Sequence, residues 1–200
     1  MRKQSWLVLT TLATNAALAS AQLPLVPHAS TLVREPAPCL AAAAHYHAVN
    51  PWLLRAILKV ESDFKADAVN RNANGTVDVG MAQINSIHFP ELARWGVTPI
   101  RLLDGCTATY VAAWHLARQI RRHGNSWYGA ASYHSTSPCQ NSRYAGLLWN
   151  TLLSWNAVTG ARLPVTSLKA CTVPAPAASR SAALASAAAS APALAFDEAP

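Results

Sequence analysis

The sequence has no apolar run after its N-terminal segment that could cross a membrane, because a spanning helix needs about 20 apolar residues in a row. It has no C-x-x-C pair and no closely spaced cysteine and histidine, which argues against a zinc site. It also has no basic runs interleaved with aromatic residues, which are typical of nucleic-acid-binding proteins. We therefore expect no membrane span, no metal and no nucleic-acid partner.

The first 21 residues have the three parts of a secretory signal peptide. Arg2 and Lys3 form a positive start, residues 6–18 are mostly apolar, and Ala19-Ser20-Ala21 offers a cleavage site. An uncleaved amphipathic N-terminus is the alternative. Without Arg2 and Lys3 the chain has 14 basic and 9 acidic residues. A basic exported protein suits an anionic polymer outside the cytoplasm, such as bacterial cell wall.

The rest of the chain divides into three segments. Residues 22–37 are rich in proline and form an irregular leader, and residues 38–160 have helical periods and caps. Residues 161–200 are dominated by Ala, Ser and Pro, so we expect a disordered tail that can bury little apolar surface. A marginal Ala-rich helix around residues 180–191 is the alternative. One domain of about 120 residues is long enough for one core.

Apolar periods and capping residues predict a mainly helical α+β domain. Val77 and Val79 alternate with a polar residue after Asn74-Gly75, which predicts a hairpin or an extended loop. A short helix is expected after residue 85. The longer predicted helices cover residues 40–49, 52–63, 107–123, 127–133 and 143–155.

Four cysteines, an even number in an exported chain, predict two disulfides. Spacing alone allows three connectivities, of which we favour Cys39–Cys106 with Cys139–Cys171.

Glu61 is a carboxylate on an apolar helix face. Leu54, Ile57 and Leu58 stand at i, i+3 and i+4, and Glu61 is the i+7 member of the same stripe. Burial favours the neutral acid and raises its pKa, which suits a general acid in glycoside cleavage. The alternative is a structural glutamate at a helix end, paired with an arginine or capping the next turn.

Neighbouring motifs favour the catalytic interpretation. Glu61-Ser62 is followed by Asp67-Ala68-Val69 and then by Gly-Met-Ala-Gln-Ile-Asn at residues 80–85. With these motifs, residues 38–155 resemble the soluble lytic transglycosylase (SLT) domain family. Residues 89–117 look like its branch found with type IV secretion, conjugation and type III secretion systems. That branch usually pairs a cysteine at the position of Cys106 with one in the first helix, which supports Cys39–Cys106.

The resemblance implies a lysozyme-like fold with a cleft for glycan strands, and no metal or cofactor. The family cleaves the β-1,4 bond between N-acetylmuramic acid and N-acetylglucosamine in peptidoglycan, leaving 1,6-anhydro ends. By this resemblance Glu61 is the only catalytic carboxylate, first an acid and then a base for the C6 hydroxyl. A hydrolase would need a second carboxylate. Asp63, Asp67 and Asp78 are available, but no motif singles one out.

The resemblance also indicates which residues meet the substrate. The segment 80–85 would line the cleft with Gln83 near Glu61, and Tyr133 matches a tyrosine whose hydroxyl bonds the catalytic glutamate. His134 and Thr136 replace the Asn and Gly of the family's Tyr-Asn-Ala-Gly. The predicted substrate-binding residues are Ser62, Gly80, Met81, Gln83, Asn85, Tyr133 and His134.

We therefore expect a monomeric lytic transglycosylase in the periplasm that binds peptidoglycan strands and opens the wall locally for a secretion or conjugation apparatus. A muramidase on the same fold is one alternative. The altered motif at His134 and Thr136 motivates another, a catalytically impaired peptidoglycan-binding component of that apparatus.

Overall fold

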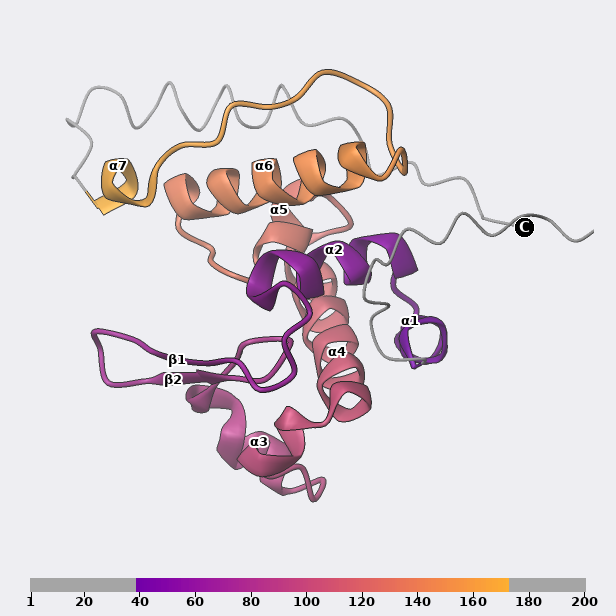
Figure 1. The fold of residues 1–200 in the computed structure, drawn as a ribbon, viewed down its shortest axis with the longest axis vertical. Coiled ribbons are helices and arrows are strands. Elements are labelled where there is room, and N and C mark those ends of the chain that lie inside the picture. The colour runs from indigo at the N-terminus through magenta and orange to yellow at the C-terminus, as the bar shows by residue number, and fades with distance from the viewer. Residues whose placement is uncertain (1–38, 173–200) are drawn as a thin grey trace, which may run out of the picture. The chain divides into compact units, whose positions relative to one another are not determined.

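The computed structural model describes residues 39–172, most of them in helices (Figure 1). The predicted signal peptide and leader and the tail from residue 173 lie outside the described residues. The helices are α1 (Leu40–His47), α2 (Pro51–Ser62), α3 (Phe89–Ala93), α4 (Gly105–His123), α5 (Trp127–Ala131), α6 (Pro138–Ser154) and α7 (Leu168–Thr172). Two 3-10 helices, η1 (Ser86–His88) and η2 (Pro99–Leu103), connect them. With the small sheet described below, this is the predicted mainly helical α+β class with a lysozyme-like fold.

Helix α2 begins and ends as its sequence predicts. The Asn50 side chain accepts a hydrogen bond from Leu53 N at 3.0 Å, and Pro51 occupies the first helical position. The helix buries the predicted apolar face, with Leu54 and Ile57 completely inaccessible to solvent. It stops because Asp63 adopts a left-handed conformation with φ of 56°. This turn leaves Glu61 in the last turn of a helix anchored in the core.

Helix α4 is the longest of the helices within residues 39–172 and contacts α1, α2 and α5. It begins at Gly105, two residues earlier than predicted, because the Asp104 side chain accepts from Thr107 N at 2.8 Å and caps the helix there. It ends before Gly124, as predicted. Helix α6 also begins early, at Pro138 rather than residue 143, because proline is well suited to a first helical turn.

The sheet has three short antiparallel strands in the order β1-β2-β3, namely Val69–Arg71, Val77–Val79 and Ile84–Asn85. Strands β1 and β2 form the predicted hairpin around Asn74-Gly75 (Figure 1). Strand β3 was not predicted, because two residues are too short to show an alternating pattern. It pairs Ile84 with Val79 and so returns the chain to the sheet directly after residues 80–83.

Both favoured disulfides are present. Cys39–Cys106 joins the start of α1 to the start of α4, and Cys139–Cys171 joins the first turn of α6 to α7. Between the helices of the second pair, residues 156–167 return along α6 (Figure 1). Asn150 of α6 exchanges two hydrogen bonds with the Leu163 backbone, each 2.9 Å long. Residues 161–172 are therefore tied to α6 by these contacts, and the domain boundary at residue 160 stays a prediction.

Gly80 generates a prediction about how the site loop is held. Its φ is +78°, and an added Cβ would lie 2.0 Å from the Leu102 carbonyl oxygen. We expect Gly80→Ala to lower the free energy of unfolding by about 2 kcal/mol or more, since strain and overpacking combine. Gly75→Ala is the matched control, because Gly75 has a φ of +83° but nothing within 4 Å. Equal losses for the two variants in urea titrations would show that the contact with Leu102 does not matter.

Candidate active site

The centre of the candidate site is a hydrogen bond between two helices. Tyr144 of α6 donates its phenol hydroxyl to Glu61 Oε1 of α2 at 2.5 Å. Tyr144 is 2% exposed, and Glu61 is half-buried. The two side chains come from positions 83 residues apart, so the packing of α2 on α6 creates the pair. Glu61, which the apolar stripe of α2 places toward the core, thus has a buried tyrosine of α6 as its hydrogen-bond partner.

The surroundings of Glu61 raise its pKa, so that a substantial fraction of the carboxyl groups is still protonated at neutral pH. Burial is the main cause, and it raises the pKa of Glu61 from 4.5 to about 7. The hydrogen bond from Tyr144 acts in the opposite direction because it favours the carboxylate, and the negative charge of Asp78 raises the pKa further. A carboxyl group that titrates near 7 can both give and take a proton at physiological pH.

The loop after β2 is tied directly to the end of α2. Ser62 donates its hydroxyl to the Met81 carbonyl oxygen at 2.7 Å. Gln83 has a positive φ of 47°, and its amide nitrogen donates to the carbonyl oxygens of Gly80 and Ala68. The donor group of Gln83 therefore holds the loop closed instead of pointing to Glu61. Met81 is 3% exposed, so its side chain belongs to the core.

Asn85 and Asp78 form a polar cluster on the sheet. Asn85 donates to Asp78 Oδ1 at 2.7 Å, and Asn72 donates to Asp78 Oδ2 at 2.8 Å. The side-chain amide oxygen of Asn85, Oδ1, caps η1 by accepting a hydrogen bond from Ile87 N. Asn85 was predicted to bind substrate, but its amide is engaged at both ends. The cluster instead fixes the orientation of the Asp78 carboxylate, whose charge acts on Glu61.

Tyr133 does not make the predicted hydrogen bond to Glu61. It is 8% exposed and donates its hydroxyl to the Ala82 carbonyl oxygen at 2.8 Å. Tyr144 takes the predicted role instead. Tyr144 lies in the helix predicted over residues 143–155, and the signal that could have identified it is a phenol hydroxyl on a buried face, which needs a polar partner just as Glu61 does. Tyr133 stabilises the loop at Ala82. Burial raises the pKa of its hydroxyl, and the charge of Glu61 raises that pKa further.

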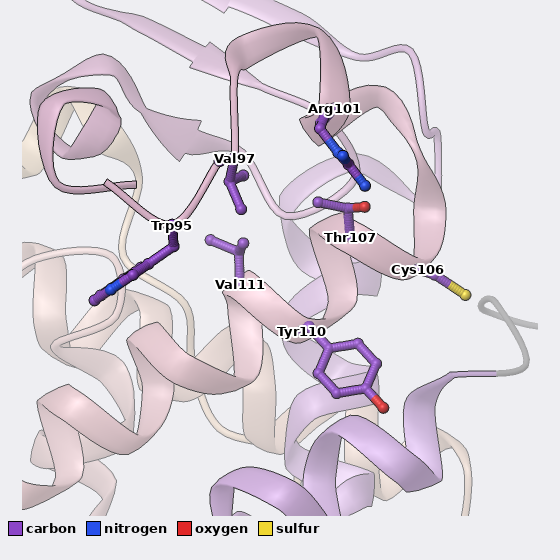
Figure 2. A pocket seen from close by; sticks show the side chains of 8 residues that line it. Trp95, Val97, Arg101, Cys106, Thr107, Tyr110 and Val111 are labelled. Atoms are coloured by element: carbon purple, nitrogen blue, oxygen red, sulfur yellow. The ribbon is translucent and has the colours of Figure 1, made fainter. Parts of the chain in front are cut away.

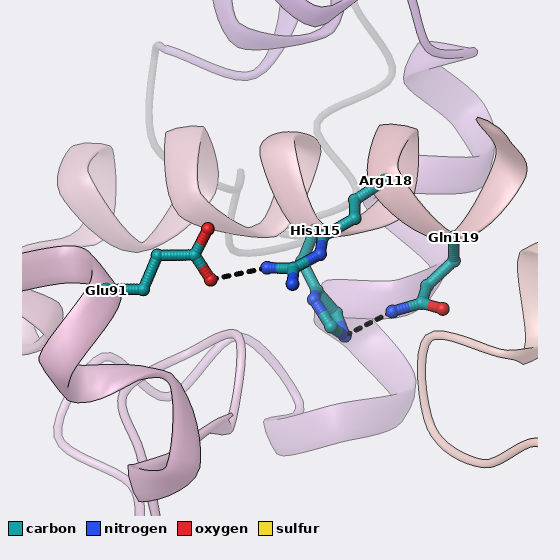
Figure 3. A network of polar contacts seen from close by, with 4 residues as sticks. All are labelled: Glu91, His115, Arg118 and Gln119. Atoms are coloured by element: carbon teal, nitrogen blue, oxygen red, sulfur yellow. Dashed lines mark hydrogen bonds and ion pairs between the residues drawn. The ribbon is translucent and has the colours of Figure 1, made fainter. Parts of the chain in front are cut away.

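A polar network on α4 supports Tyr133 from the other side. His115 Nε2 lies 3.2 Å from the Tyr133 carbonyl oxygen and 3.4 Å from Gln119 Nε2. Burial lowers the pKa of His115 to about 4, so the imidazole is neutral at pH 7. Figure 3 shows this pair beside the ion pair of Arg118 with Glu91, which joins α4 to α3. The network supports the backbone at Tyr133 and joins α4 to α3. Within residues 39–172, Glu61 accepts its side-chain hydrogen bond from Tyr144 and not from a member of this network.

His134 lies on the solvent side of the site. It is exposed, and its imidazole stacks on the Tyr144 ring with centroids 4.8 Å apart and an interplanar angle of 8°. Of the predicted substrate-binding side chains, His134 is therefore one whose outer face remains open to solvent. Ser62, Gln83, Asn85 and Tyr133 have at least one polar group engaged in holding the site together.

A separate pocket of about 380 Å³ lies beside the start of α4. Figure 2 shows Val97 and Val111 facing one another there, between Trp95 and Arg101. The lining includes none of the predicted catalytic or substrate-binding residues. Within residues 39–172, no three His, Cys, Asp or Glu side chains gather closely enough to hold a metal ion.

The raised pKa of Glu61 makes stability depend on pH. The folded state favours the neutral acid, so this stabilisation is complete below pH 4.5 and is lost as the pH rises through about 7. We expect Glu61→Gln to match the wild type at pH 4 and to be more stable at pH 8.5 by about 1–3 kcal/mol. Urea unfolding of both proteins across this range measures the difference. A difference that does not change with pH would mean that Glu61 titrates normally.

Comparisons with known proteins agree with these motifs. A family model described as the transglycosylase SLT domain matches residues 38–161. The X polypeptide of Escherichia coli is 33% identical over 135 residues, covering 64% of this chain and 80% of its own. Invasion protein IagB of Salmonella typhimurium is 34% identical over 118 residues (56% and 74%), and protein IpgF of Shigella flexneri is 34% identical over 104 residues (51% and 68%). Since the matched segment spans more than half of the sequence, the chain belongs to the transglycosylase SLT domain family, a family of lytic transglycosylases.

Proposed function

We propose that this protein is a lytic transglycosylase that cleaves the β-1,4 bond between N-acetylmuramic acid and N-acetylglucosamine in peptidoglycan. The observation that carries the proposal is the half-buried carboxyl group of Glu61, which accepts a hydrogen bond from the Tyr144 phenol and whose pKa burial raises to about 7. Such a group can serve as acid and base in consecutive steps without a second carboxylate.

In the proposed reaction Glu61 first donates one proton and then accepts one. Neutral Glu61 gives its proton to the glycosidic oxygen, and the N-acetylglucosamine side leaves as its C4 hydroxyl. The Glu61 carboxylate, which accepts a hydrogen bond from the Tyr144 hydroxyl, then takes the proton of the muramoyl C6 hydroxyl while the C6 oxygen forms its bond to C1. No water is consumed, and Glu61 is neutral again. The nucleophile belongs to the substrate, which gives the second step the advantage of a tethered reaction.

A muramidase is the second candidate, and the position of Asp78 favours considering it. Asp63 is exposed and pairs with Lys59, and Asp67 is exposed. Asp78, in contrast, is half-buried on β2 with both oxygens hydrogen-bonded, and its charge acts on Glu61. It is the one of the three that could support a hydrolytic mechanism with two carboxylates.

We also propose that the protein acts in the periplasm, as an exported monomer, and opens the wall locally for a secretion or conjugation apparatus. The signal-peptide pattern of residues 1–21 and the basic net charge support export to an anionic polymer. A relative named as an invasion protein supports a role beside such an apparatus. No helix among the described residues is long and apolar enough to cross a membrane.

The products of peptidoglycan digestion test the reaction. We expect the oxidised protein to release muropeptides one water lighter than reducing ones, because the C6 oxygen replaces water at C1. Glu61→Gln should lower the rate by at least about a hundredfold, since it removes the only acid and base. Mass spectrometry of the released sugars measures both. Ordinary reducing ends would assign a hydrolase, and glycan binding without any cleavage by the wild type would leave only a binding role.

Asp78→Asn separates the two candidate enzymes. For a transglycosylase we expect anhydro products to persist, with the alkaline limb of the activity profile moved to lower pH. The direction follows because the Asp78 charge raises the pKa of Glu61, so its removal lowers that pKa. Asp63→Asn is the matched control, an exposed aspartate that pairs with Lys59. A loss of about a hundredfold or more for Asp78→Asn alone, with reducing products in the wild type, would support the muramidase.

A further inference from the structure

The Tyr144–Glu61 pair has one aromatic cover on its solvent side. The imidazole of His134 lies parallel to the Tyr144 ring, at 4.8 Å between centroids and 8° between planes. Tyr144 itself is 2% exposed, whereas His134 is exposed. The His134 ring therefore covers one face of the phenol whose hydroxyl donates to Glu61.

The loop that carries His134 is pinned on both sides of it. The Asn141 side chain donates to the Ser135 carbonyl oxygen at 2.9 Å and to the Tyr128 carbonyl oxygen at 3.0 Å. The Tyr128 hydroxyl donates to the Thr136 carbonyl oxygen at 3.1 Å. His134 N also donates to Ala131 O, which joins the loop to the end of α5. These hydrogen bonds fix the backbone that carries the His134 ring, so the stacking contact does not have to order a free loop.

We propose that His134 is a positioning residue, whose ring shields the Tyr144–Glu61 hydrogen bond from water and so sets the pH range in which Glu61 can donate its proton. The effect on Glu61 follows from burial alone; the effect on rate rests on the function proposed above. Burial is the largest cause of the raised pKa of Glu61. Water admitted beside the pair would solvate the carboxylate and lower that pKa toward 4.5.

The groups around the His134–Tyr144 stack determine the protonation state of the His134 imidazole. One face of the otherwise exposed His134 ring is desolvated against Tyr144. This partial burial and the charge of Arg143 of α6 lower the pKa of His134, and the charge of Asp78 of β2 opposes them. Glu61 faces Tyr144 and the same Asp78. The imidazole is therefore neutral at pH 7. When it gains a proton in mild acid, its charge lies over the Tyr144 ring, strengthens the phenol as a donor and favours ionised Glu61.

Two substitutions separate the cover from its charge. His134→Ala removes the ring, so we expect the Glu61 titration to fall by about one pH unit and the activity at pH 8 to fall about tenfold. His134→Phe restores a flat cover that cannot titrate. In His134→Phe we expect the pKa of Glu61 and the alkaline limb of the activity profile to return to their wild-type values. We also expect the variant to lack the change in activity that occurs in the wild type when the imidazole gains its proton in mild acid. His134→Gln, which is polar but has no ring, should behave like His134→Ala.

Two measurements keep the outcomes distinct. The carboxyl ¹³C shift of Glu61, followed from pH 4 to 9 in the full mature chain, reports its titration without any substrate. The pH profile of peptidoglycan cleavage reports the consequence for rate. An unchanged Glu61 titration in His134→Ala, or wild-type behaviour of His134→Gln, would overturn the role of the ring whatever the activity. A wild-type protein without cleavage activity would overturn the proposed function, while the titration would still decide the role of His134.

Discussion

The hydrogen bond from Tyr144 to Glu61 is the interaction on which the rest of the site depends. It places a phenol hydroxyl on a carboxyl group at the junction of α2 and α6, where neither group is fully hydrated. A buried polar group without its partner costs about 1–3 kcal/mol, so each of these side chains needs the other. Helix α6 is held on its other side by the Cys139–Cys171 disulfide to α7 and by the hydrogen bonds between Asn150 and Leu163. The fold thereby holds one acid in an environment that raises its pKa to about 7.

Most residues predicted to bind substrate also build the walls of this environment. Ser62 ties α2 to Met81, Gln83 closes its own loop, and Tyr133 holds the Ala82 carbonyl. A rigid loop keeps donors and acceptors at fixed positions, which saves the ordering that a flexible site would require on binding. The segment 80–85 therefore acts mainly through the shape that its hydrogen bonds impose, with Gly80 packed against Leu102 as its fixed end.

The sequence predicts the parts of this site that depend on local pattern. The stripe of Leu54, Ile57 and Leu58 identifies Glu61, and Asn50-Pro51 identifies the start of its helix. It does not predict which tyrosine reaches Glu61, because Tyr133 and Tyr144 both lie on buried faces and only the tertiary packing of α6 decides. The packing of residues 161–172 against α6 does not follow from local pattern for a similar reason. It rests on Asn150, the disulfide and other contacts made far along the chain, and not on local apolar residues.

The protonation state of Glu61 in the wild-type protein tests this view of the site most directly. Infrared difference spectra between the wild type and Glu61→Gln, recorded from pH 4 to 9, isolate the carbonyl stretch of the protonated Glu61 side chain. If burial controls the group, that band persists through pH 6 and disappears with a midpoint at about 7. A band that disappears near 4.5 would show an ordinary solvated carboxylate, and Glu61 could not then be the acid of a reaction at neutral pH.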